Sequence, residues 1–124
     1  MVKKRILIIE DDTMAQYLLK KRLSHGGYRC IGVSSAEKAL EILEKTDPDL
    51  VILDLGLQRA DGTAFLSHAK DWLPPGRKVP PILVMSGHDH QDIVDYCFEH
   101  GAKAFIRKPL KPENLLSLVE RSLA

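Results

Sequence analysis

The stretch Leu50-Val51-Ile52-Leu53, which runs directly into Asp54, decides the fold of this sequence. Four consecutive branched apolar residues without polar alternation are typical of a β-strand that helices cover on both faces. Two other runs have the same character, Ile6-Leu7-Ile8-Ile9 and Ile82-Leu83-Val84-Met85. They indicate a parallel sheet, because the crossover helices between parallel strands pack on both sides of it.

Five short apolar runs alternate with segments of helical spacing, which predicts an α/β fold built on a five-stranded parallel sheet. The predicted strands are Arg5 to Ile9, Arg29 to Val33, Leu50 to Leu53, Ile82 to Met85 and Ala104 to Ile106. The second run is more broken than the others and suits an edge of the sheet. Capping boxes predict the starts of the first two helices, Thr13 with Gln16 and Ser34 with Glu37.

Composition narrows the class of protein. The 124 residues carry a formal net charge of +1, with 44% apolar and 28% charged residues. These values predict one globular domain over residues 1–124 and exclude intrinsic disorder. Near-neutral charge argues against a broad nucleic-acid face, and no apolar run is long enough for a membrane span or a signal peptide. We therefore expect a cytoplasmic protein with no direct nucleic-acid or membrane partner, and with Cys30 and Cys97 reduced.

Polar residues follow four of the predicted strands, and this is where a ligand site is expected. In an open parallel sheet, ligands bind outside the carboxyl ends of the strands. The residues at these ends are Glu10-Asp11-Asp12, Asp54, Ser86-Gly87 and Lys108-Pro109. They are expected to converge on one rim of the sheet, with Asp12 more suited to capping the first helix than to binding a metal.

Carboxylates gathered at one rim need a proton or a cation. Two of them about 4 Å apart repel by roughly 4 kcal/mol at an effective dielectric constant of 20. Oxygen ligands at an open rim suit Mg²⁺, which keeps several of its waters. A carboxylate nucleophile beside a divalent metal, the hydroxyl of Ser86 and the ammonium of Lys108 would make a phosphoryl-accepting site. Asp54 alone would more simply be a turn or helix cap.

The motifs together resemble the receiver domain of two-component response regulators. They are Ile9-Glu10-Asp11-Asp12, Leu53-Asp54-Leu55, Met85-Ser86-Gly87 and Phe105-Ile106-Arg107-Lys108-Pro109. The resemblance covers essentially the whole chain. It implies a flavodoxin-like, doubly wound (βα)₅ fold with strand order 2-1-3-4-5.

The resemblance also implies a site. Asp54 would accept a phosphoryl group from a sensor histidine kinase or a phosphotransfer protein. Asp11 would ligate Mg²⁺ directly, Glu10 through water, Asp54 by one carboxylate oxygen and Gly56 by its backbone carbonyl.

A conformational switch is implied as well. Ser86 and Lys108 would bind the phosphoryl oxygens, and the peptide bond before Pro109 would be cis. Ser86 would move toward the phosphoryl group while Phe105 swings inward. This movement would reshape the surface formed by the fourth helix, fifth strand and fifth helix for a downstream effector, or for a phosphorylation-dependent homodimer.

Two positions differ from the residues common in receivers, and two others lie where receivers tune the lifetime of the phosphoryl group. Gln58 stands where many receivers carry proline, so the loop from Gly56 to Gly62 is expected to move more. Phe105 lacks the hydroxyl of the commoner tyrosine, so its rotation would be driven by packing alone. Gly56 and His88 occupy positions that tune phosphoryl lifetime in receivers, and the sequence does not say in which direction His88 acts.

Several alternatives stay open at this stage. A receiver-like module that docks without phosphorylation is the main one, although the intact set of acids, serine and lysine argues against it. A phosphatase with an aspartyl nucleophile would want a second acid where Gly56 stands. His88-Asp89-His90 has too few partners for a zinc site. We expect no enzyme activity beyond slow loss of the protein's own phosphoryl group.

Overall fold

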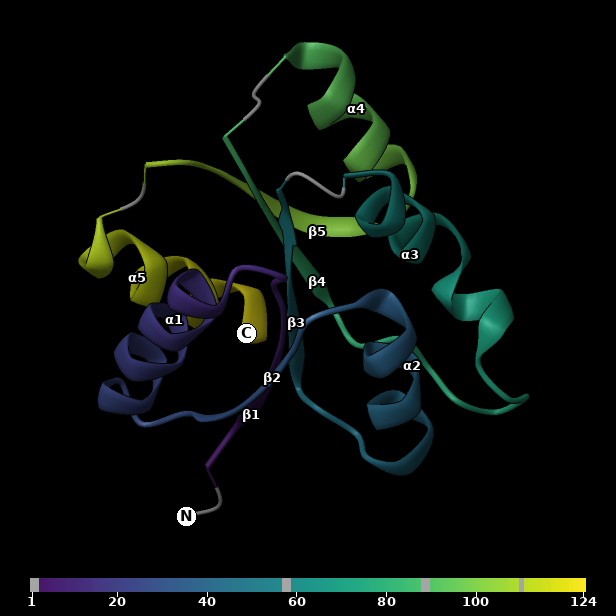
Figure 1. The fold of residues 1–124 in the computed structure, drawn as a ribbon, viewed down its shortest axis with the longest axis horizontal. Coiled ribbons are helices and arrows are strands. Elements are labelled where there is room, and N and C mark those ends of the chain that lie inside the picture. The colour runs from purple at the N-terminus through teal and green to yellow at the C-terminus, as the bar shows by residue number, and fades with distance from the viewer. Residues whose placement is uncertain (1–2, 57–58, 88–89, 110) are drawn as a thin grey trace.

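The computed structural model describes residues 3–56, 59–87, 90–109 and 111–124. In these residues, five strands form one parallel sheet in the order β2-β1-β3-β4-β5, as predicted (Figure 1). The strands are β1 (Arg5–Ile9), β2 (Arg29–Val33), β3 (Leu50–Leu55), β4 (Ile82–Ser86) and β5 (Ala102–Arg107). The helices are α1 (Thr13–His25), α2 (Ala36–Lys45), α3 (Arg59–Trp72), α4 (Gln91–Glu99) and α5 (Pro112–Leu123).

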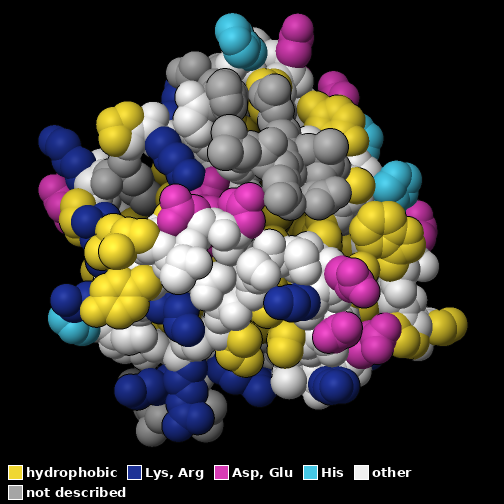
Figure 2. Space-filling model, viewed as in Figure 1, with side chains coloured by type: hydrophobic (Ala, Val, Ile, Leu, Met, Phe, Trp, Pro, Cys, Tyr) yellow, Lys and Arg dark blue, Asp and Glu magenta, His cyan; other side chains and the backbone are white. Residues whose placement is uncertain are grey.

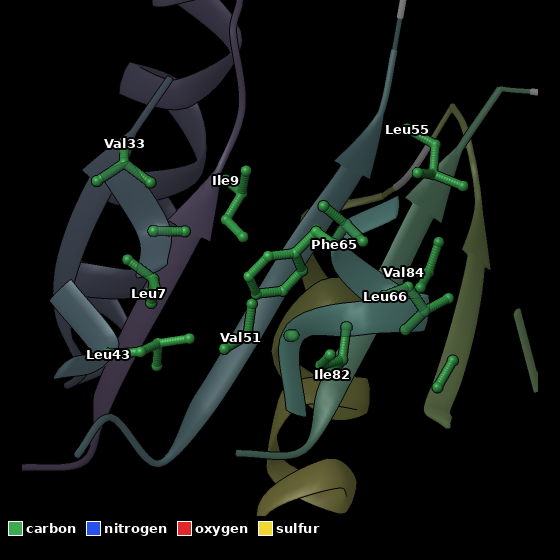
Figure 3. Packing of buried hydrophobic residues seen from close by; sticks show 14 of the residues in the cluster. Leu7, Ile9, Val33, Leu43, Val51, Leu55, Phe65, Leu66, Ile82 and Val84 are labelled. Atoms are coloured by element: carbon green, nitrogen blue, oxygen red, sulfur yellow. The ribbon is translucent and has the colours of Figure 1, made fainter. Parts of the chain in front are cut away.

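Helices cover both faces of the sheet, which explains the unbroken apolar runs. Figure 1 shows α1 and α5 on one side of the sheet and α2, α3 and α4 on the other. Along β3, Val51 and Leu53 belong to the core cluster under α2 and α3, whereas Leu50 and Ile52 belong to the cluster under α1 and α5. Phe65 of α3 is fully buried among the first group (Figure 3). A strand buried on both faces needs apolar residues at every position rather than at every second one.

Three strands extend beyond the predicted apolar runs. β3 continues through Asp54 to Leu55, and β4 continues to Ser86, because Asp54 pairs with Met85 and Leu55 with Ser86 in the parallel ladder. β5 begins at Ala102 rather than at Ala104. Asp54 therefore lies within the paired part of β3 and not after it. Its main chain is held by pairing with β4.

The two predicted capping boxes are wrong. Asp12 caps α1, where its Oδ1 accepts from the amides of Met14 (2.9 Å) and Ala15 (3.2 Å), so Thr13 is already helical. Asp12 as a cap was itself expected, and aspartate is a better N-cap than threonine. Ser35 caps α2, with its Oγ accepting from the amide of Lys38 at 3.2 Å.

Two further predictions, the cis peptide bond before Pro109 and the unpaired state of the two cysteines, agree with the structure. The Lys108–Pro109 peptide bond is cis. Cys97 is buried, Cys30 is half-buried, and both thiols are free. No helix of the described residues has the length and apolar character needed to cross a membrane.

Arg77 ties the end of the sheet opposite the acidic residues together. Its Nη2 donates to the carbonyls of Leu43 (2.7 Å) and Thr46 (3.1 Å) at the end of α2, and its Nη1 lies 3.1 Å from Asp47. Replacing it with methionine removes two charge-assisted hydrogen bonds, each of which contributes roughly 1.5–3 kcal/mol.

We therefore predict that Arg77→Met lowers the free energy of unfolding by about 2 kcal/mol or more in urea denaturation. Lys78→Ala, at the exposed neighbouring position, should change it little. Equal stability of the Arg77→Met variant and the wild type would contradict this role.

Candidate active site at the carboxyl edge of the sheet

The sheet brings most of the predicted site residues to one edge. Glu10 and Asp11 directly follow β1, Asp54 lies near the end of β3, Ser86 ends β4, and Lys108 directly follows β5. The amide of Lys108 donates to the carbonyl of Ser86 at 2.9 Å, which fixes the start of the chain after β5. In Figure 2, acidic side chains gather near the centre of the view with a Lys or Arg side chain beside them.

Lys108 and Asp54 form the central contact of this edge. The Lys108 Nζ lies 2.7 Å from Oδ1 and 2.5 Å from Oδ2 of Asp54. The Asp54 side chain is 1% exposed, whereas that of Lys108 is 35% exposed. The ammonium therefore contacts both oxygens of a carboxylate that is almost completely buried.

Glu10 is a buried acid with an incomplete set of partners. Its residue is 4% exposed. Its Oε1 accepts from the amide of Asp12 at 2.9 Å, while its Oε2 is buried without a hydrogen-bond partner among the described residues. Burial, the largest cause, and the neighbouring Asp54 carboxyl raise the pKa of Glu10 to about 8, because Asp54 repels an ionised Glu10 and would accept a hydrogen bond from a protonated one. The Asp12 amide and Lys108 act in the opposite direction.

Asp11 and Gly56 complete the acidic pocket. A Cβ built on Gly56 would lie 3.6 Å from Asp11 Oδ1, so the Asp11 carboxylate sits against the backbone that follows β3. Glu10, Asp11, Asp54 and Gly56 line a cavity of about 30 Å³. A cavity of this size holds a water molecule or a small ion.

These residues fit a divalent cation that keeps most of its waters. The unpartnered Glu10 Oε2 is an acceptor that is costly to leave buried, and an oxygen-liganded cation would satisfy it. Within the described residues, no three His, Cys, Asp or Glu side chains are placed so that they could hold a metal ion. A structural zinc site would need such a group, because it takes four protein ligands. Mg²⁺ does not need one, because it is usually held by one or two carboxylates together with waters.

The two predicted switch residues lie close to this edge. Ser86 is fully buried at the end of β4. Phe105, in β5, is half-buried and packs against the core cluster under α2, α3 and α4. Their movements stay predictions. Gln58 and His88 lie outside the described residues.

Gln16 makes contacts that its spacing in the sequence does not indicate. Instead of completing a capping box, its Nε2 donates to the carbonyls of Glu10 (3.0 Å) and Val33 (3.1 Å). One sequence signal could have indicated these contacts. Gln16 lies one turn into a helix that directly follows an acidic loop.

The raised pKa of Glu10 predicts how the stability of the metal-free protein depends on pH. The folded protein holds a proton on Glu10 up to about pH 8, whereas the unfolded chain releases it near 4.5. The folded state thus binds more protons between these values, so its free energy of unfolding should fall as the pH rises, by up to about 1.4 kcal/mol per pH unit.

Glu10→Gln should flatten this decline, since the amide cannot ionise. Urea denaturation in EDTA at pH 5 and pH 8.5 measures it, with the exposed Glu41→Gln as the matched control. A decline that is as steep in Glu10→Gln as in the wild type would show that another group is responsible.

Comparison with known proteins places this geometry in a family. The family model of the response regulator receiver domain matches residues 6–120. The transcriptional regulatory protein PdtaR of Mycobacterium tuberculosis (strain ATCC 25618 / H37Rv) is 29% identical over 124 residues, and the match covers 99% of this chain and 58% of PdtaR. The chain thus spans little more than half the length of that relative.

Solved structures agree with the match. A CheY-like response regulator receiver domain protein from Methanospirillum hungatei JF-1 superposes with a TM-score of 0.85 and 29% identity, covering 98% of this chain and 94% of that one. The receiver domain of sensor histidine kinase PA1611 from Pseudomonas aeruginosa PAO1, which has a magnesium ion in its active site cleft, gives a TM-score of 0.83 at 24% identity, covering 98% of each chain. Since the family model spans Glu10, Asp54 and Lys108 together with nearly all of the fold, the chain belongs to the response regulator receiver domain family.

Proposed function

We propose that Asp54 is the phosphoacceptor of a two-component signalling switch, and that its donor is a sensor histidine kinase or a phosphotransfer protein. The observation that carries this proposal is the contact of Lys108 Nζ with both oxygens of Asp54, beside a buried Glu10 oxygen that lacks a partner. A carboxylate flanked by an ammonium and by acidic oxygens that could hold a cation is suited to receiving a phosphoryl group.

The transfer follows from these contacts. One Asp54 oxygen attacks phosphorus as the bond from phosphorus to the donor imidazole nitrogen breaks, and the imidazole retains the electron pair of that bond. Lys108 leaves the carboxylate and pairs with a phosphoryl oxygen, so its charge stays opposite an anion throughout. The Ser86 hydroxyl donates to another phosphoryl oxygen.

Mg²⁺ is the proposed cofactor. Glu10, Asp11, Asp54 and the carbonyl of Gly56 would hold it, directly or through water. When bound, it supplies positive charge next to the phosphoryl oxygens. The magnesium ion in the cleft of the PA1611 receiver domain supports this assignment.

The output is proposed to be a change of surface rather than catalysis. A phosphoryl group adds up to about two negative charges and three strong acceptors. Ser86 and Phe105 are the residues that would relay this change to the face formed by α4, β5 and α5. We propose that this face then meets an effector protein or domain, or a second copy of the chain, in the cytoplasm.

A receiver fold that docks without phosphorylation is the alternative. It gives no reason for the incomplete partnering of Glu10, because a passive docking module has no need for a buried acid with an unused oxygen. Phosphoryl uptake separates the two functions.

We predict that acetyl phosphate with Mg²⁺ adds the mass of one phosphoryl group to the wild-type chain, and that Asp54→Asn does not gain it. Intact-protein mass spectrometry measures the uptake, with Asp71→Asn on the exposed side of α3 as the control that still gains the mass. Labelling of Asp54→Asn to the wild-type extent would overturn the proposed acceptor, and no labelling of any variant would favour the docking module.

A further inference from the structure

We propose that Gln16 is a positioning residue that holds Glu10 and Asp11 in their metal-binding arrangement by clamping the backbone between the ends of β1 and β2. The inference rests on the proposed function, because it concerns the same acidic pocket. It adds a residue of α1 whose side-chain amide bonds backbone carbonyls rather than a carboxylate.

The clamp uses both amide hydrogens of one side chain. Gln16 Nε2 donates to the Glu10 carbonyl at 3.0 Å and to the Val33 carbonyl at 3.1 Å. The Val33 carbonyl also accepts from the Glu10 amide at 3.0 Å. The backbone of Glu10 is therefore held at its N–H by β2 and at its C=O by α1, and a primary amide has just the two donors that this requires.

Gly32 provides the space for the clamp. A Cβ built on Gly32 would lie 2.8 Å from Gln16 Cγ and closer still to its Cδ and Oε1. The backbone at Gly32 does not have a positive φ, unlike that at Gly27, Gly76 and Gly101. The absence of a side chain at Gly32 is thus explained by the close approach of Gln16 rather than by backbone conformation.

The clamped carbonyl belongs to the peptide unit that joins the two acids. Glu10 lies on one side of that peptide and Asp11 on the other, and both line the acidic cavity with Asp54. Without the clamp, the Glu10 carbonyl would turn toward water and the peptide would rotate. Both carboxylates would then leave their places together, and the hydrogen bond from the Asp12 amide to Glu10 Oε1 would weaken.

Groups that orient metal ligands without binding the metal typically change affinity by about 10- to 100-fold when they are removed. We therefore expect Gln16→Met, which keeps the length of the side chain but has no donor, to weaken Mg²⁺ binding by roughly 10-fold or more in isothermal titration. Lys21→Met, on the exposed side of the same helix, is the matched control and should bind like the wild type.

A second variant tests the clamp from its other side. Gly32→Ala leaves Gln16 unchanged but places a methyl group where its amide lies, so it should weaken Mg²⁺ binding to a similar extent. In Gln16→Ala/Gly32→Ala the clash is gone and the donors are also gone. The double variant should therefore be more thermally stable than Gly32→Ala, while its Mg²⁺ affinity stays low. If Gln16 had only a structural role, Mg²⁺ affinity would recover together with stability.

Amide hydrogen exchange gives a readout that does not depend on the metal. In the metal-free protein, Gln16→Met should lose protection at the Asp12 and Glu10 amides but keep it in β3 and β4. If Gln16→Met does not fold, the double variant takes its place.

The outcomes distinguish the inference from the function on which it rests. Mg²⁺ affinities of Gln16→Met and Gly32→Ala within about twofold of the wild type would overturn the clamp and leave the proposed function standing. A wild type that binds no Mg²⁺ would overturn the proposed function and the clamp with it.

Discussion

The ion pair between Lys108 and Asp54 is the interaction on which the carboxyl edge of the sheet depends. Asp54, Glu10 and Asp11 line one small cavity. At an effective dielectric constant of 20, each pair of ionised carboxylates about 4 Å apart costs roughly 4 kcal/mol. One ammonium on Asp54 and one proton on Glu10, whose pKa lies near 8, allow these groups to coexist. In the proposed function, a metal cation would take the place of the Glu10 proton, and Lys108 would pair with the phosphoryl group instead of the Asp54 carboxylate.

The hydrophobic core fixes the positions of the residues at the carboxyl edge of the sheet. β1, β3 and β4 are buried on both faces over most of their length, so packing holds the strands that lead to Glu10, Asp54 and Ser86 from both sides. The strand order reverses between β1 and β3, and the chain leaves them toward helices on opposite faces of the sheet (Figure 1). The acidic pocket lies at this reversal, where parallel α/β sheets generally bind their ligands. The buried strands thus stabilise the fold, and the polar residues at their ends form the candidate site.

Much of this arrangement could be predicted from the sequence, because the signals for it are local. Apolar runs predict strands, and parallel strands bring the residues after them to one edge, which places Asp54 near Lys108 although 54 positions separate them. The details that failed were settled by competition between hydrogen-bond partners. Of the two caps expected for α1, Asp12 rather than Thr13 forms the bonds, Ser35 replaces Ser34 as the cap of α2, and the Gln16 amide bonds two carbonyls instead of capping. Such choices depend on which acceptor lies nearest in three dimensions, and spacing along the chain does not reveal that.

In the proposed function, a divalent metal, the Asp54 carboxylate and Lys108 respond together at the carboxyl ends of the strands. The most direct test is ¹H–¹⁵N NMR of the wild-type chain, with Mg²⁺ added first and beryllofluoride second. We expect Mg²⁺ to shift the amide signals of residues 10–12 and 54–56, and beryllofluoride then to shift those of Ser86, Lys108 and Phe105. Shifts spread over α2 and α3 instead, or spectra unchanged by both additions, would contradict this expectation.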